Sequence, residues 1–142
     1  QGAYYCSDSP ETAIAEWSYH TARFWRQFNY NEEVSAVVRC YTGRFEQALI
    51  DIRQCAYLCQ KDPSHLYKIH GEFAALLRQK QPRQQQAFGI LYRSSRRKGG
   101  ECAALLRPPA TSALTQSGHY ALMFDGQAFR EYAKLGELKS IG

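Results

Sequence analysis

A loop rich in serine, arginine and glycine is the part of the sequence best suited to chemistry. It runs from Arg93 to Gly100, reads RSSRRKGG and carries two hydroxyls and four cations beside a Gly-Gly pair. Glycine lets the backbone approach a ligand closely, and backbone N–H groups can then surround an anion. The loop is therefore predicted to present positive side chains and N–H groups to a phosphate. A solvated basic loop accounts for the same composition.

Two short apolar segments position this loop. The segments Gly89 to Tyr92 and Cys102 to Leu106 are bounded by turn residues, which is typical of buried strands. Upstream, Ser9-Pro10-Glu11 is a helix start, because Ser9 can cap a first-turn N–H and Pro10 suits the first helical position. This helix is expected to run to about Phe28 and to bury the stripe Ile14, Trp17, Thr21, Trp25 and Phe28.

The remaining elements predict an α+β domain with a mixed sheet. Strands or extended segments are expected at Gly2 to Cys6, Val34 to Tyr41, Phe45 to Ile52 and Tyr120 to Phe124. Helices are expected at Leu66 to Gln79 and Ala128 to Leu135. A break is expected at Asp62-Pro63-Ser64 and a polar hinge at Lys80 to Gln86.

Composition narrows the classes of ligand. The 142 residues suit one domain, and the net charge of +5 with a pI near 9.0 favours a nucleotide, a nucleic acid or an acidic protein. Five cysteines are an odd number, which suits free thiols in the cytoplasm better than disulfides. Their spacing indicates no metal site. No apolar run of transmembrane length and no signal peptide is visible.

Glu16 lies on the polar face of the predicted first helix. That face also carries Thr12, His20, Arg23 and Gln27. On periodicity alone, Glu16 is a solvent-facing residue with a weak helical contact to His20 or Arg23.

Two blocks of the sequence resemble the RES family, bacterial toxins named for an Arg, a Glu and a Ser, with a fold similar to ADP-ribosyltransferase toxins. One block reads G-I-x-Y-x-S-x-R-x-x-G-G-x-C-x-A-L from Gly89 to Leu105. The other pairs Gly2-Ala3-Tyr4-Tyr5 with Glu11-Thr12-Ala13-Ile14-Ala15-Glu16, similar to the family's G-x-x-Y strand and E-T-A-x-A-E helix start.

The resemblance implies a single RES-like catalytic domain over residues 1–142, with a split sheet around a cleft and flanking helices. It implies that Glu16 is the catalytic carboxylate and that Ser94 binds the NAD or orients Glu16. Tyr5 would line the nicotinamide side, and Arg96 would pair with phosphate. The polar face of the first helix would then form one wall of the cleft. The family's namesake Arg has no counterpart, because the chain begins at Gln1; an N-terminal segment is expected to be missing, or the residue is lost.

The function implied is a cytoplasmic toxin that cleaves the nicotinamide–ribose bond of NAD and passes ADP-ribose to water or phosphate. An alternative acceptor is a protein side chain. A reading of a different class is a basic nucleic-acid-binding module, in which the tyrosines stack on bases. NAD is expected as substrate, without a metal, and the expected partner is an antitoxin, for example of the Xre type, or an immunity protein.

Overall fold

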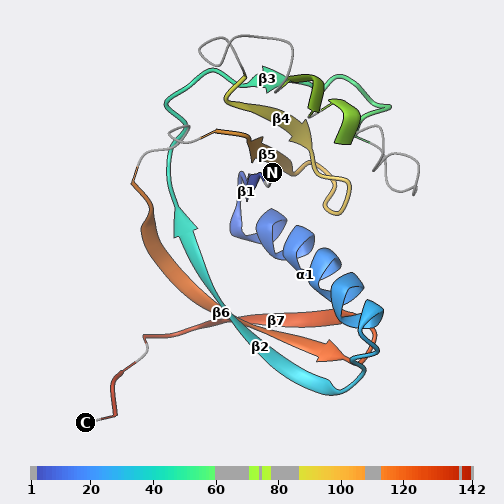
Figure 1. The fold of residues 1–142 in the computed structure, drawn as a ribbon. Helices are drawn as coiled ribbons and strands as arrows, with labels where there is room; N and C mark the ends of the chain where they lie inside the picture. The colour runs from blue at the N-terminus through green and yellow to red at the C-terminus, as the bar shows by residue number, and fades with distance from the viewer. Residues whose placement is uncertain are drawn as a thin grey trace. The chain divides into compact units, whose positions relative to one another are not determined.

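The computed structural model describes residues 3–59, 71–73, 75–77, 87–107, 113–137 and 139–141. The chain forms two compact units (Figure 1). The first contains Gln1–Ala13 and Phe45–Ser112, and the second contains Ile14–Arg44 and Ala113–Gly142.

The first unit is built on a four-stranded mixed sheet. Its strands are β1 (Tyr4–Ser7), β3 (Ile50–Asp51), β4 (Gly89–Arg93) and β5 (Glu101–Leu105), in the order β1-β5-β4-β3. The pairs β1/β5 and β5/β4 are antiparallel, whereas β3/β4 is parallel. The two apolar segments that flank the basic loop are strands, as predicted. The structure pairs them as antiparallel neighbours, with the loop as their hairpin connection.

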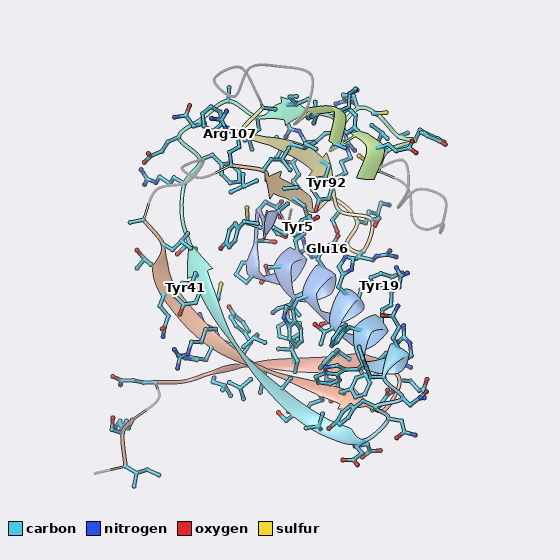
Figure 2. All side chains as sticks on the ribbon, in the orientation of Figure 1. Tyr5, Glu16, Tyr19, Tyr41, Tyr92 and Arg107 are labelled. Carbon is cyan, nitrogen blue, oxygen red and sulfur yellow. The ribbon has the colours of Figure 1, made fainter. Side chains whose placement is uncertain are left out.

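The core of the first unit lies on one face of this sheet. Ala103 and Leu105 of β5 are buried there, and partly buried Cys6, Leu49, Phe88 and Leu91 pack against them. Burial raises the pKa of the Cys6 thiol. The guanidinium of Arg107, labelled in Figure 2, lies over the Phe88 ring, 4.7 Å from its centre.

The helix α1 (Pro10–Gln27) begins as predicted. The backbone N–H of Thr12 donates to Ser9 Oγ at 3.3 Å, so Ser9 caps the first turn. The helix ends at Gln27, close to the predicted end at about Phe28, and Asn29 just beyond it adopts a positive φ of 56°. Phe28, expected in the buried stripe, is instead 69% exposed.

The second unit contains a three-stranded antiparallel sheet. Its strands are β2 (Glu33–Thr42), β6 (Thr115–Asp125) and β7 (Phe129–Leu135), in the order β2-β6-β7. The expected strands at 34–41 and 120–124 both lie within longer strands. The helix expected at Ala128 to Leu135 is wrong, since this segment is β7.

The turn between β6 and β7 explains that difference. Asp125 Oδ1 accepts the N–H groups of Gln127 at 2.9 Å and Ala128 at 2.7 Å, and Gly126 has φ of 88°. Such a turn sends the chain back along β6, where main-chain pairing outweighs the helical propensity of Arg130, Glu131, Ala133, Lys134 and Leu135.

Aromatic packing joins the helix to this sheet within the second unit. The ring of Trp25 lies 4.9 Å from Phe124 and 5.2 Å from Phe129, and Trp17 lies 5.2 Å from Phe129 (centroid distances). Leu122 and Phe124, which share a face of β6, are almost fully buried. The helix therefore covers that face of the sheet (Figure 1).

The predicted α+β class is confirmed, with one mixed and one antiparallel sheet. Within 45–52 the strand is limited to Ile50–Asp51, apart from an isolated bridge at Phe45. Residues 71–73 and 75–77 are helical, inside the helix expected at 66–79. The rest of that helix, the break at 62–64 and the hinge at 80–86 lie outside the described residues.

Candidate functional site

The basic loop between β4 and β5 is held closed by its own hydrogen bonds. The N–H of Ser94 donates to Gly100 O at 2.9 Å, and the N–H of Gly100 donates to Arg97 O at 3.1 Å. Ser94 Oγ accepts the N–H groups of Arg96 at 3.1 Å and Arg97 at 3.0 Å. The Ser94 hydroxyl therefore shapes the loop from inside.

This bonding changes the prediction for phosphate. The N–H groups of Ser94, Arg96, Arg97 and Gly100 bond within the loop. The expected cradle of backbone N–H groups is therefore wrong at these four positions. An anion would meet the positive side chains of the loop instead.

The loop is fastened to the first turn of α1 through Thr12. Arg97 Nη1 donates to Thr12 Oγ1 at 3.3 Å, and the hydroxyls of Thr12 and Ser9 lie 2.8 Å apart. Thr12 has no exposed surface, although periodicity alone placed it on a polar face. Arg97 thus has a bonded side chain, which a purely solvated basic loop would not provide.

The two glycines of the loop serve different purposes. Gly99 has φ of 79°, a conformation that side chains disfavour, and a Cβ there would meet nothing within 4 Å. A Cβ on Gly100 would lie 2.7 Å from both Cγ2 and Oγ1 of Thr12. Gly99 therefore permits the turn, and Gly100 permits the loop to contact the helix.

A charge network fixes the strand that follows the loop. Arg53 Nη1 lies 2.8 Å from both carboxylate oxygens of Glu101, and Arg53 Nε donates to Asp51 Oδ1 at 2.9 Å. These bonds from Arg53 lower the pKa of Asp51 to about 2. They raise the pKa of Arg53 itself. Glu101, the acidic residue that directly follows the loop, is thus bound by Arg53.

Tyr5 lies on the sheet face opposite the core of the first unit. In β1 it pairs with Ala104, while the neighbouring Cys6 pairs with Ala103 of the core. Side chains alternate along a strand, so Tyr5 shares its face with Ser7 and, across Cys102, with Tyr92 (Figure 2). Tyr5 is 67% exposed, so it is accessible to a flat ligand rather than buried in the core.

Glu16 belongs to the second unit, one helical turn after Thr12 on α1 (Figure 2). Its side chain is 19% exposed, and its Oε2 lies 3.7 Å from Nε2 of His20. The contact with His20 that periodicity allowed is present. The solvent-facing position that periodicity predicted is wrong, because most of the Glu16 side chain is not exposed.

The four predicted site residues thus have different surroundings. Ser94 and Arg96 lie in the loop and share a hydrogen bond, and the Nε atom of Arg96 is buried. Tyr5 is in the same unit, and Glu16 is in the other. The contact of Thr12 with Gly100 was missed. The sequence signal for this contact was that Thr12 stands three residues after the helix cap Ser9.

The second unit also carries a hollow lined by aromatic side chains. It measures about 400 Å³ and is bordered by Phe24, Trp25, Phe28 and Tyr30. The rings of Phe24 and Phe28 lie 4.8 Å apart, and both side chains are exposed. Its lining suits an apolar group and not a phosphate.

The chain is thus an α+β protein with a basic hairpin loop and a helical glutamate, Glu16, whose side chain is mostly buried. The RES domain model matches residues 1–125, and the chain belongs to the RES domain family. RES domains are associated with toxins and with NAD, so an NAD-processing enzyme in general is indicated. No curated protein and no solved structure matched the chain.

Within the described ranges, no three His, Cys, Asp or Glu side chains gather where they could hold a metal ion. In the same part of the chain, no helix combines the length and apolar character needed to span a membrane.

Proposed function

We propose that this protein is a toxin that cleaves the bond between nicotinamide and ribose in NAD. The observation that carries the proposal is the match to the RES domain family over residues 1–125. Both sequence blocks that resemble the family form defined structure. The block from Gly89 to Leu105 forms the hydrogen-bonded loop with its two flanking strands, and the other block forms β1 and the start of α1. An ADP-ribosyltransferase-like cleft is part of the proposal.

In this reaction the C1′–N bond breaks and nicotinamide leaves with the bonding electrons. Water adds to the ribose carbon and releases a proton, which gives ADP-ribose; phosphate in place of water gives ADP-ribose phosphate. The ribose carries positive charge in the transition state. An anionic group near that carbon is therefore the main requirement.

Glu16 is the group proposed to stabilise this charge. A carboxylate about 4 Å away at an effective dielectric near 20 contributes about 4 kcal/mol, roughly a thousandfold in rate. The low exposure of Glu16 supports this role, since a shielded carboxylate interacts more strongly than a hydrated one.

The residues of the first unit are proposed to bind the substrate. Tyr5 offers an exposed aromatic face for the pyridinium ring, and Arg96 offers a guanidinium for the pyrophosphate. Ser94, whose Oγ accepts two N–H groups of the loop, is proposed to hydrogen-bond the substrate or to orient Glu16, and not to act as a nucleophile.

Replacement of Glu16 tests this function. Glu16→Gln keeps the shape of the side chain and removes its charge, so release of nicotinamide from NAD should fall about a hundredfold or more. The matched control is Glu11→Gln, an exposed carboxylate in the first turn of the same helix, which should stay within about twofold. Equal activity of Glu16→Gln and wild type would contradict the role of Glu16, and no nicotinamide release by wild type would contradict the function.

The acceptor and the partners remain parts of the proposal. Transfer of ADP-ribose to a protein is the alternative, and labelled NAD distinguishes the two, because only transfer leaves label on protein. Nucleic-acid binding is the alternative of another class, and it would release no nicotinamide. We further propose a cytoplasmic location and an antitoxin that presents acidic groups to the basic loop, because an NAD-consuming enzyme must be inhibited in the cell that makes it.

A further inference from the structure

The face of the second unit's sheet that points away from α1 is apolar at its centre. Val37, Ala121 and Ala133 form one row across β2, β6 and β7. Met123 shares this face, because it lies two residues along β6 from Ala121. Val37 is 59% exposed and Met123 is 42% exposed. Large apolar side chains therefore stand in solvent on the side opposite the helix.

Opposite charges occupy two corners of this face. Arg39 follows Val37 by two residues on β2, and Glu131 precedes Ala133 by two residues on β7. Arg39 therefore lies on the strand to one side of Ala121 and is displaced along the strand direction by two residues. Glu131 lies on the strand to the other side and is displaced by two residues in the opposite direction. With normal sheet spacings both positions lie about 8 Å from Ala121. The three residues form a diagonal with Ala121 at its middle.

We propose that this open face binds the same face of a second copy of the chain. The twofold axis of this dimer lies in the plane of the face, passes through Ala121 and is perpendicular to the diagonal. Rotation about this axis places Arg39 over the partner's Glu131. The same rotation places Glu131 over the partner's Arg39, since a twofold interface repeats every contact. Val37 then lies close to the partner's Met123. Strands of the two copies cross at about 70°, near the orthogonal class of sheet packing.

The charge pattern selects this crossing over a parallel stack. A twofold axis along the strands would place Arg39 on the partner's Leu135, and an axis across them would place it on the partner's Ser35. Neither arrangement pairs the two charges, and the first brings a guanidinium onto an apolar side chain. Only the diagonal axis satisfies both corners together with the apolar centre.

The size of the face predicts a weak association. Three strands about 4.8 Å apart and five or six residues long cover only a few hundred Å². Interfaces below about 1,200 Å² in total are typical of transient complexes. The dimer is therefore expected to be weak, so that its formation depends on protein concentration.

Sedimentation velocity at about 10 to 500 µM tests the interface. Wild type should shift from monomer to dimer across this range. Arg39→Glu and Glu131→Arg should each weaken association at least tenfold, because each places like charges opposite one another. The double variant Arg39→Glu with Glu131→Arg exchanges the charges and should restore association to within about threefold of wild type.

The controls are Lys98→Glu and Glu46→Arg, which make the same changes of charge at exposed residues of the first unit. Both should associate like wild type. The double variant also shows that loss in the single variants is not unfolding. If wild type is a monomer at every concentration, the proposal is overturned. It is also overturned if Arg39→Glu and Glu131→Arg both dimerise as strongly as wild type. Failure of the double variant to restore association overturns the pairing of Arg39 with Glu131 and the proposed geometry with it.

Discussion

A methyl group added at Gly100 should push the basic loop away from α1. Its Cβ would lie 2.7 Å from two side-chain atoms of Thr12, and Thr12 is fully buried. Neither the loop nor the first helical turn can move freely, because Ser94 bonds to Gly100 O and Ser9 bonds to Thr12. Overpacking at such a site costs about 1–3 kcal/mol. Gly100→Ala should lower the free energy of unfolding by about 2 kcal/mol.

A double-mutant cycle with Thr12→Ala isolates this contact. Thr12→Ala removes both atoms that the new methyl group would meet, although it loses the bonds to Ser9 and Arg97. The double variant should therefore be more stable than the sum of the two single effects predicts, by about 1 kcal/mol or more. Urea unfolding followed by circular dichroism measures all four proteins. Additive effects within about 0.5 kcal/mol would refute the steric reasoning.

The neighbouring glycine is the matched control for this cycle. Gly99→Ala makes the same chemical change, but its Cβ meets open space, and its cost comes from φ of 79°. That cost, about 1 kcal/mol, should not change when Thr12 is replaced. Release of nicotinamide should fall in Gly100→Ala more than in Gly99→Ala, since only the first displaces the loop from the helix.

Two further predictions concern the charge pairs. Arg53→Met should raise the pKa of Asp51 from about 2 toward 3.8, as measured by NMR titration, since Arg53 is the main cause of the lowering. Because the folded pKa is lowered, the stability that this pair supplies is present above about pH 4 and lost as the pH falls toward 2, so wild type and Arg53→Met should converge in acid. Asp125→Ala should lower the thermal midpoint more than Asp125→Asn does, because Asn keeps an acceptor for the turn N–H groups and loses only the bond to Arg130.

Local signals in the sequence were enough to predict the start of α1. Ser9 and Pro10 act within one helical turn, and the structure confirms the cap on Thr12. The two strands beside the basic loop were predictable for a similar reason, since each is a short apolar run bounded by turn residues. Their pairing as antiparallel neighbours was not predicted and comes from the structure.

The misses have a common physical origin in contacts between distant residues. Phe129 to Leu135 contains good helix formers, and its pairing with β6 depends on the Asp125–Gly126 turn. The burial of Thr12 depends on Gly100, 88 positions further on in sequence. The sequence periodicity of α1 alone could not show either the burial of Thr12 or the shielding of Glu16.

Neither sheet consists of contiguous chain, and this affects when the protein can fold during synthesis. Tyr4 of β1 pairs with Leu105, and Glu33 of β2 pairs with Asp125. Until Leu105 and Asp125 have emerged from the ribosome, β1 and β2 of the nascent chain lack the strands with which they pair. The helix that carries Glu16 is then made long before the loop that carries Ser94 can close. A protein proposed to consume NAD would thus stay inactive at least until the residues up to Asp125 have been made.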